Sequence, residues 1–370
     1  YKIEPLNGDE TRNVDTAQMG GESAVFMMLN RGKRSVCIDL DDNETHEILI
    51  KLAKEADIIT ENYMPGKTEE MGIDYESIKS INPGIIYCSF SAFGHSGPYM
   101  NRPGLDMAVQ AMSGIMSITG EPEGRPMRPG FTVVDSTCGI TAAYGIIAGL
   151  FNRERTGKGM QINLSLLDHA IAIQGTMVSL YFAKNENPPR MGNASPFTFA
   201  QDFKTGDGKY ITFSIGHEGF WQKFRKTLGS KELMDDPRFA SFQSFKTISD
   251  NMQDLVEICQ RRFMEKDGKE WERLFIEGGI PCSLVNTYEE VFRDKQVQHN
   301  KMVLEFDHPK AKKIKLLRNP LLLNKKIITG ENLPPPLLGQ HTRESLLGIG
   351  FGNEQIDIWE EKGIIKALNQ

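Results

Sequence analysis

Cysteine is scarce in this 370-residue sequence, and its five copies form no recognisable pattern. They stand at Cys37, Cys88, Cys138, Cys259 and Cys282. Their number is odd, their spacing is wide and no CxxC pair occurs, so the sequence predicts neither a disulfide framework nor a zinc site. Free thiols of this kind are typical of a reducing compartment, and we therefore expect a cytoplasmic protein.

The common motifs of nucleotide and metal chemistry are also missing. The sequence contains no P-loop G-x-x-x-x-G-K-[ST], no G-x-G-x-x-G and no H-E-x-x-H. Its seven histidines are isolated from one another. We therefore expect no metal site.

An excess of basic residues is absent, as is a long apolar run. The net charge of −6 argues against a nucleic-acid-binding protein. No run approaches the roughly 18 apolar residues of a membrane span, and we recognise no signal peptide. With 39% hydrophobic and 25% charged residues, the composition is that of an ordinary soluble protein of about two domains.

What the sequence does contain is an alternation of strand and helix patterns. Short apolar runs predict the strands, and apolar residues at helical spacing predict the helices. The predicted strands cover 2–4, 35–40, 57–60, 84–90 and 160–164, and the predicted helices cover 24–30, 41–56, 75–81, 106–119, 136–152 and 166–183. The alternation predicts an α/β fold with a parallel sheet, in which ligands bind beyond the carboxyl ends of the strands.

The character of the chain changes after a linker rich in Asn, Pro and Gly over 185–195. The turn Gly206-Asp207-Gly208 predicts a hairpin whose second strand covers 209–215. Further helices are predicted over 217–228, 246–265 and 268–277, and further strands over 278–285, 302–307 and 313–316. These segments predict a smaller α+β domain.

One carboxylate, Asp135, stands between an apolar run and the predicted helix 136–152. Aspartate is a preferred N-cap residue, and the start of a helix favours a negative charge, which would keep Asp135 ionised. Backbone amides at that end can also hold an oxyanion, and the small residues Thr137 and Gly139 leave room for a ligand. Taken alone, Asp135 predicts a helix cap. In an enzyme it is the candidate nucleophile.

Two other candidates for catalysis have less support. His95 and Ser96 adjoin each other, but Gly97 directly follows the serine, so the G-x-S-x-G elbow of serine hydrolases is missing. A loop that offers amides to an anion is the better interpretation of that segment. His169 could serve as a base, although a histidine used for packing or lying on the surface fits its position better.

Seven segments of the chain, taken in order, resemble the family III CoA-transferases, the group that includes formyl-CoA transferase and carnitine CoA-transferase. Each segment alone is a weak signal, but the ordered set extends over nearly the whole chain. The matching segments are Asn30 to Ser35 (NRGKRS), Asp57 to Gly72 (DIITENYMPGKTEEMG), Asn82 to Ser89 (NPGIIYCS), Phe93 to Tyr99 (FGHSGPY), Asp135 with Gly139, Thr156 to Gly159 (TGKG) and Leu338 to Thr342 (LGQHT).

The resemblance implies a fold and a mechanism. The large Rossmann-like domain would comprise residues 1–195 and 318–370, the small α+β domain 200–315, and two subunits would interlock as a homodimer. Asp135 would take CoA from an acyl-CoA donor as an aspartyl-CoA thioester and pass it to a carboxylic acid acceptor. Coenzyme A and acyl-CoA would be substrates, with no permanently bound cofactor, no metal, no nucleic acid and no membrane involved.

The resemblance also places the CoA contacts. We add the basic side chains Lys33, Arg34, Lys67 and Arg102 as candidates for pairing with CoA phosphates. The predicted CoA-binding residues are Lys33, Arg34, Ile38, Asp39, Asn62, Tyr63, Met64, Lys67, Arg102, Pro103, Gly104, Leu105 and Asp106.

Two other functions stay open at this level. An α-methylacyl-CoA racemase shares the fold but moves a proton with a His–Asp pair. Its histidine falls at Leu105, which cannot carry a proton, so the sequence favours CoA transfer. The third hypothesis is a non-catalytic CoA-binding protein, against which the intact Asp135 argues. This chain also departs from the family at Pro5, where a basic residue is common, and around Gly192 to Phe197, where a glycine-rich flap is not obvious.

Overall fold

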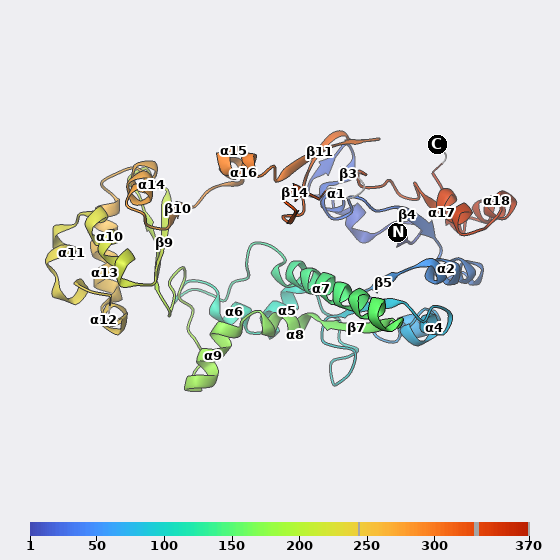
Figure 1. The fold of residues 1–370 in the computed structure, drawn as a ribbon, viewed down its shortest axis with the longest axis horizontal. Helices are drawn as coiled ribbons and strands as arrows, with labels where there is room; N and C mark the ends of the chain where they lie inside the picture. Colours follow the sequence, from blue (N-terminus) through green and yellow to red (C-terminus); the bar gives the residue numbers. More distant parts are fainter. Residues whose placement is uncertain (243–244, 329–332, 369–370) are drawn as a thin grey trace. The chain divides into compact units, whose positions relative to one another are not determined.

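The computed structural model describes residues 1–242, 245–328 and 333–368 (Figure 1). Contacts between residues divide the chain into two compact units. Unit 1 consists of Tyr1–Asp106, Val134–His169 and Phe292–Gln370, and unit 2 consists of Met107–Val133 and Ala170–Val291.

Unit 1 contains two three-stranded sheets, and most of their strands are parallel. The first sheet has the order β1 (Lys2–Glu4), β4 (Ser35–Ile38), β15 (Ile365–Lys366), with only β15 antiparallel to its neighbour. The second has the order β5 (Ile58–Glu61), β6 (Ile86–Ser91), β7 (Met160–Ser165), all parallel. Every residue of β4 is buried, as expected for a strand covered on both faces. The predicted α/β class with a parallel sheet is confirmed.

Aspartate residues cap helices that lie between these strands. The side chain of Asp42 accepts a hydrogen bond from the Glu44 amide at the start of α2 (Asn43–Glu55). Asp74 does the same for α4 (Tyr75–Ile81). The remaining short elements of the outer chain segments are η1 (Glu10–Asn13), β2 (Gln18–Met19), β3 (Glu22–Ser23), α1 (Ala24–Leu29), α3 (Lys67–Glu70), α15 (Tyr288–Arg293), α16 (Lys295–His299), β11 (Val303–His308), β12 (Lys312–Leu317), β13 (Leu322–Leu323), β14 (Lys326–Ile327), α17 (Thr342–Gly348) and α18 (Asn353–Glu361).

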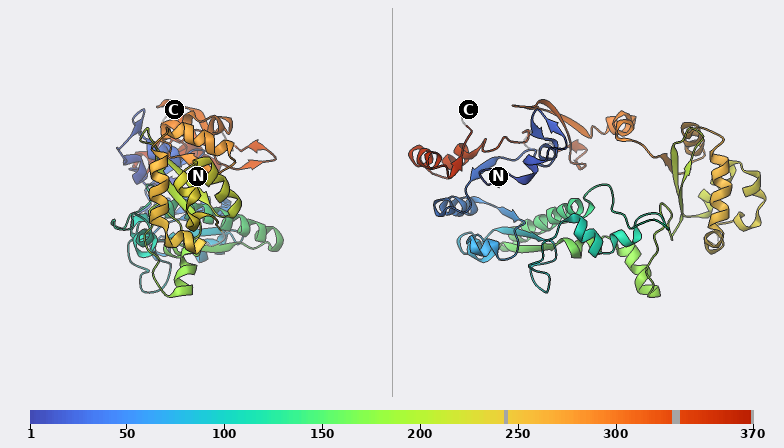
Figure 2. Two further views of the ribbon diagram at one scale, coloured as in Figure 1. Left: turned by 90° about the vertical axis from the view of Figure 1, so that its left-hand side faces the viewer. Right: turned by 180° about the vertical axis from the view of Figure 1, so that it is seen from behind.

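The long helix α7 (Val133–Thr156) lies along the β5–β6–β7 sheet (Figures 1 and 2). Glycines allow the close approach, because a Cβ at Gly149 would stand 3.1 Å from a side-chain carbon of Ile86 and 3.3 Å from one of Met160. Within the described part of the chain, α7 is also the one helix that is long and apolar enough to cross a membrane, although only 22% of its most apolar window is buried. One such helix is weak evidence for a membrane span, because the core helix of a soluble protein can have the same length and composition.

Several predicted helices have different bounds in the structure. The one predicted over 246–265 is divided into α12 (Phe245–Asp250) and α13 (Met252–Phe263). The helix predicted from residue 136 begins at Val133. The one predicted over 106–119 is divided into α5 (Asp106–Met112) and α6 (Ile115–Ile118), because Gly114 adopts a left-handed conformation with φ of 92°. The one predicted over 166–183 is divided into α8 (Leu166–Ala172) and α9 (Gly175–Lys184), where the side chain of Gln174 donates a hydrogen bond to the Ala170 carbonyl.

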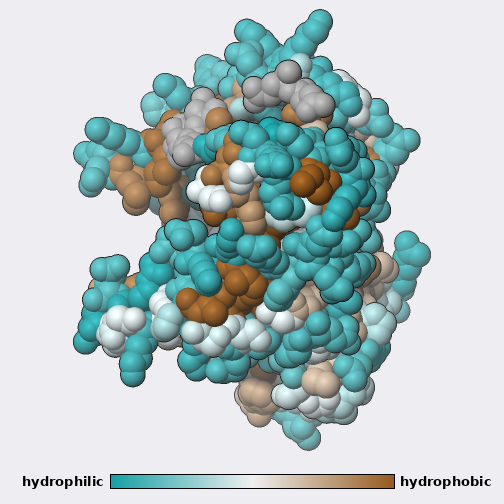
Figure 3. All heavy atoms as spheres, turned by 90° about the vertical axis from the view of Figure 1, so that its right-hand side faces the viewer, coloured by the Kyte–Doolittle hydropathy of each residue, from teal (hydrophilic) through white to brown (hydrophobic). Residues whose placement is uncertain are grey.

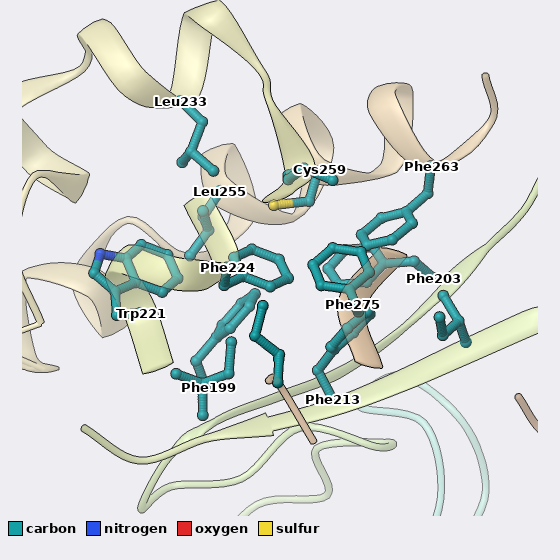
Figure 4. Close-up of a cluster of buried hydrophobic side chains, with 14 of the residues drawn as sticks. Phe199, Phe203, Phe213, Trp221, Phe224, Leu233, Leu255, Cys259, Phe263 and Phe275 are labelled. Atoms are coloured by element: carbon teal, nitrogen blue, oxygen red, sulfur yellow. The ribbon is translucent and has the colours of Figure 1, made fainter. Parts of the chain in front are cut away.

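Unit 2 is built around an antiparallel sheet and an aromatic core. The sheet order is β10 (Cys282–Leu284), β9 (Tyr210–Ile215), β8 (Phe199–Lys204), so the predicted hairpin is confirmed. Its helices are α10 (Glu218–Leu228), α11 (Lys231–Asp235), η2 (Pro237–Phe239), α12 (Phe245–Asp250), α13 (Met252–Phe263) and α14 (Gly268–Glu277). Figure 4 shows the buried rings of Trp221, Phe224 and Phe275 gathered over the sheet. Phe203 and Phe263 stack with their ring centroids 4.7 Å apart.

Candidate active site

Asp135 lies in the first turn of α7 and lines a cavity of about 1100 Å³ within unit 1. The cavity wall near the carboxylate also includes Cys138 and Gly139 from α7, and Gly104 and Leu105 from the loop before α5. The size fits a small-molecule or cofactor site. The sequence expectation that a ligand can approach the start of α7 agrees with this arrangement.

The start of α7 is capped by Asp106. Its Oδ2 atom accepts hydrogen bonds from the amides of Val134 at 2.9 Å and Asp135 at 3.1 Å, and the residue is only 5% exposed. Because the helix begins at Val133, Asp135 lies inside the first turn and is not the N-cap. Two of the amides that could have held an oxyanion are therefore already occupied. No local pattern in the sequence predicts this contact, which joins residues 28 and 29 positions apart.

The electrostatic setting of Asp135 differs from the one expected at a bare helix start. Burial and then the neighbouring charge of Asp106 raise the pKa of Asp135. The residue is still accessible to solvent, so a ligand in the cavity can reach it. A carboxylate whose pKa is raised is a stronger base and a better nucleophile once it is ionised.

A thiol stands one helical turn beyond Asp135. Burial and then the charge of Asp135 raise the pKa of Cys138. The thiolate is the nucleophilic form of cysteine, so a buried thiol beside a carboxylate is kept in its unreactive form. Asp135 is therefore the better nucleophile of the two side chains.

The basic side chains on the cavity wall, Lys2 and Lys33, both come from the N-terminal part of the chain. Lys2 forms an ion pair with Asp9 at 2.6 Å. Although burial acts in the other direction, hydrogen bonds from Lys2 and Thr11 lower the pKa of Asp9 to about 2. Lys33 donates a hydrogen bond to Asn30 Oδ1 at 2.9 Å, and burial and the nearby Lys2 lower the pKa of Lys33.

The structure brings only some of the predicted CoA-binding residues to this cavity. Those that line it are Lys33, Asn62, Tyr63, Gly104 and Leu105. The remaining predicted residues do not line the cavity. Of the basic ones, Arg34 pairs with Glu344 at 2.6 Å, Lys67 pairs with Glu70 at 3.5 Å, and Arg102 lies over the rings of Phe93 and Tyr99.

The other predicted residues outside the cavity wall have varied surroundings. Ile38 is fully buried in β4, Asp39 accepts a hydrogen bond from the Asp41 amide, and Asp106 caps α7. Met64 and Pro103 are exposed.

His169 has a defined place that the sequence did not predict. Its Nε2 atom lies 2.8 Å from Thr137 Oγ1, and its Nδ1 atom lies 3.2 Å from Thr141 Oγ1, so the ring joins α8 to α7. Burial lowers the pKa of His169. Among the described residues, no group of His, Cys, Asp and Glu side chains could hold a metal ion.

Comparisons of the sequence with known proteins agree with one another. The family model described as CoA-transferase family III matches residues 1–342. The succinyl-CoA:glutarate CoA-transferase of Mus musculus is 38% identical over 347 residues, which is 93% of this chain and 78% of the relative. The enzyme of the same name from Homo sapiens is 36% identical, with the same coverage of both chains.

A solved structure supports the same relationship. The crystal structure of a CAIB/BAIF family protein from Brucella suis matches with a TM-score of 0.82 at 32% sequence identity. The match covers 94% of this chain and 90% of that protein. The similarity thus extends through both units and includes the segment that carries Asp135.

Proposed function

The chain belongs to CoA-transferase family III and is an enzyme that transfers CoA from an acyl-CoA to a carboxylic acid; we propose that Asp135 is its nucleophile. The observation that carries the proposal is the place of this carboxylate on the wall of a large cavity, with its pKa raised and only a protonated thiol as its nearest competitor. Three other acidic side chains line the wall, namely Asp9, Glu55 and Glu61. Asp9 is already paired with Lys2.

The proposed reaction divides one exchange into four attacks. The Asp135 carboxylate attacks the thioester carbonyl of the donor, the C–S bond breaks, and a mixed anhydride and a CoA thiolate form. The thiolate attacks the aspartyl carbonyl of that anhydride, which releases the donor acid and leaves an aspartyl-CoA thioester. The acceptor carboxylate attacks this thioester and frees the thiolate again. The thiolate then attacks the acceptor carbonyl, which gives the new acyl-CoA and restores Asp135.

Every step of this sequence generates an oxyanion and uses a carboxylate or a thiolate, and no net proton is consumed. Holding the attacking group in place is therefore the main task of the protein. Asp106 serves that task because it accepts hydrogen bonds from the amide of Asp135 itself and from that of the preceding Val134.

For the substrates we propose short dicarboxylic acids, by similarity to relatives named for succinyl-CoA and glutarate. CoA would contact the cavity-lining residues Lys33, Asn62, Tyr63, Gly104 and Leu105. Lys33 is the cation best placed to meet a CoA phosphate, since its present partner is the neutral amide of Asn30. The other predicted contacts stay part of the proposal for the bound state.

We also propose that the enzyme is an interlocked, cytoplasmic homodimer whose large domain is Rossmann-like and whose middle segment is the small α+β domain. The support is an apolar stripe along α7, formed by Ile140, Tyr144, Ile147 and Phe151, each about two-thirds exposed. Hydrophobic patches also interrupt the hydrophilic surface in Figure 3. Patches of this kind mark protein–protein contacts. The stripe is about 16 Å long, whereas a membrane core is about 30 Å thick, so a second copy of the chain suits it better than lipid.

The test of the nucleophile is the variant Asp135→Asn. An amide cannot attack the thioester, so we expect kcat for transfer from succinyl-CoA to glutarate to fall by more than about a thousandfold, equivalent to about 4 kcal/mol of barrier. The matched control is Asp235→Asn, an exposed aspartate of unit 2, which should keep full activity. Asp135→Asn activity within about tenfold of the wild type would rule the proposal out.

The same variant has a second expected effect, on stability. Because the pKa of Asp135 is higher in the folded chain than in the unfolded chain, the folded state loses stability as the pH rises through these two values. At neutral pH the ionised group therefore destabilises the fold. We expect Asp135→Asn to raise the free energy of unfolding at pH 7 and to leave it unchanged or lower at pH 3, which thermal unfolding at both pH values would measure.

A further inference from the structure

The back of the nucleophile's helix carries a polar contact of its own. The imidazole of His169 lies between the hydroxyls of Thr137 and Thr141, with its two nitrogens 2.8 and 3.2 Å from the respective Oγ1 atoms. Both threonines belong to α7, and the histidine belongs to α8. The contact therefore joins the first two turns of α7 to the element that follows β7.

This contact lies away from the cavity. Successive residues of an α-helix are turned by about 100°, so Thr137 and Thr141 stand about 200° and 240° around α7 from Asp135. Gly139, which lines the cavity with Asp135, is only about 40° away. His169, Thr137 and Thr141 are all absent from the cavity wall. Any influence of His169 on the reaction must therefore pass through the backbone of α7.

One peptide group connects the two sites. The Oγ1 atom of Thr137 lies 3.4 Å from the carbonyl oxygen of Val134, to which it donates. That carbonyl and the amide of Asp135 belong to the same peptide plane, and the amide donates to Asp106. The plane that precedes the nucleophile is thus held at its oxygen by Thr137 and at its nitrogen by Asp106.

One placement of the hydrogens satisfies the contacts of His169 and of the Thr137 hydroxyl. A neutral imidazole donates from one nitrogen and accepts at the other. If Nε2–H donates to Thr137 Oγ1, the hydroxyl proton of Thr137 is directed to the Val134 carbonyl, and Nδ1 accepts from the Thr141 hydroxyl. The Thr141 hydroxyl, which also lies 3.3 Å from the Thr137 carbonyl oxygen, then donates to the ring instead. The lowered pKa of His169 agrees with a neutral ring. In this state His169 orients the Thr137 hydroxyl.

We propose that His169 is a positioning residue for the transfer reaction, acting through Thr137 to fix the peptide plane that carries Asp135. The proposal rests on the role of Asp135 as nucleophile. Displacement of a reacting group by about 1 Å can reduce a rate by about a hundredfold, so loosening this plane is expected to slow the chemical steps without weakening the binding of substrates.

The test compares single variants, their double variant and a control. We expect His169→Ala and Thr137→Val each to lower kcat by about tenfold, with KM changed by less than about twofold. Because the two residues act as one unit, the kcat of the double variant should lie within about twofold of the kcat of His169→Ala. His169→Gln, which can still donate to Thr137, should recover part of the lost kcat. The matched control is His299→Ala, an exposed histidine in α16, which should leave kcat unchanged.

A second measurement separates this proposal from the one it rests on. Each folded variant is mixed with succinyl-CoA and hydroxylamine in a single turnover, and the rate at which Asp135 becomes labelled is followed by peptide mass. Slower labelling of Asp135 in the His169 variants, relative to the wild type, supports the positioning role. Equal labelling rates, or a loss of activity that lies entirely in KM, would overturn it. Absence of the Asp135 label in the wild type would instead refute the nucleophile itself.

If His169→Ala fails to fold, Thr141→Val offers a milder change, because it removes one hydroxyl and keeps the volume of the side chain. It removes the contact at Nδ1 and the alternative bond from the Thr141 hydroxyl to the Thr137 carbonyl oxygen, and it leaves the contact at Nε2 in place. We expect a two- to fivefold lower kcat at an unchanged KM, again with slower labelling. A Thr141→Val enzyme with a wild-type kcat and labelling rate would count against the proposal.

Discussion

Helices α10 of unit 2 and α7 of unit 1 use their apolar residues in different ways. In α10, Trp221, Phe224 and Leu228 recur at helical spacing and are fully buried in the aromatic core. In α7 the buried residues are smaller, namely Val134, Cys138, Ala142 and Gly149, and four large apolar side chains are about two-thirds exposed, namely Ile140, Tyr144, Ile147 and Phe151. The first pattern completes a core within the chain.

Besides the contact of Thr137 and Thr141 with His169, helix α7 presents three further surfaces. One side, with Gly145 and Gly149, approaches the sheet, and another, with Asp135 and Gly139, faces the cavity. The third is the exposed stripe that we assign to a second copy. The apolar residues of α10 therefore stabilise unit 2 from within, whereas those of α7 leave surfaces that other groups can approach.

The largest effect on stability is expected in the aromatic core. Phe263 is fully buried, stacks on Phe203 and contacts the ring of Trp271 at 5.2 Å between centroids. Phe263→Ala leaves a cavity, and we expect it to lower the free energy of unfolding by about 3–5 kcal/mol in a denaturant titration. The neighbouring Met264 is 47% exposed, so Met264→Ala should change it by less than about 0.5 kcal/mol. Equal effects of the two variants on the free energy of unfolding would show that the buried rings do not form the stabilising core of unit 2.

An intermediate effect is expected at the cap of α7. Asp106→Asn keeps one oxygen that can accept from both amides but removes the negative charge, so we expect a loss of about 0.3–1 kcal/mol in stability. Removing that charge should lower the pKa of Asp135, which burial will still hold above its usual value. The acidic limb of the profile of kcat/KM against pH should therefore move to lower pH. An acidic limb that stays at the same pH, or moves to higher pH, would contradict the proposed coupling between Asp106 and Asp135.

An effect of similar size and opposite sign is expected from the glycines of α7, and it separates the face toward the ligand from the face toward the sheet. A Cβ at Gly139 would meet nothing within 4 Å, so Gly139→Ala should stabilise the helix by about 0.5–1 kcal/mol. It should also raise KM for acyl-CoA, because Gly139 lines the cavity. Gly149→Ala, whose Cβ would press on Ile86 and Met160, should give no such gain in stability. A stabilised Gly139→Ala enzyme with unchanged KM would show that this face does not meet the substrate.

Local signals predicted much of the fold. The helix over 75–81 is predictable because its apolar spacing lies within one short segment. The start of α7 was placed three residues late, since the apolar residues before Asp135 continue the helix. The division of the helix predicted over 166–183 depends on Gln174 and the Ala170 carbonyl, a choice that apolar spacing does not reveal.

The candidate site was predictable in part for the same reason. Asp135 could be found from its segment and from the ordered resemblance to a family. The roles of Asp106 and His169 depend on contacts between residues 28 to 32 positions apart, and such contacts leave no pattern in a single sequence. Family resemblance placed Asp106 among CoA contacts, whereas in the structure its carboxylate caps the helix of the proposed nucleophile.

The central claim is that Asp135 becomes covalently linked to CoA during the reaction. The most direct measurement is to incubate the wild-type enzyme with succinyl-CoA, trap the acyl intermediate with hydroxylamine and map the modified residue by peptide mass. We expect a hydroxamate on Asp135 in the peptide from α7, and none on the other cavity-lining acids Asp9, Glu55 and Glu61. A hydroxamate on any of those three residues, or an active enzyme that yields none at Asp135, would show that Asp135 is not the nucleophile.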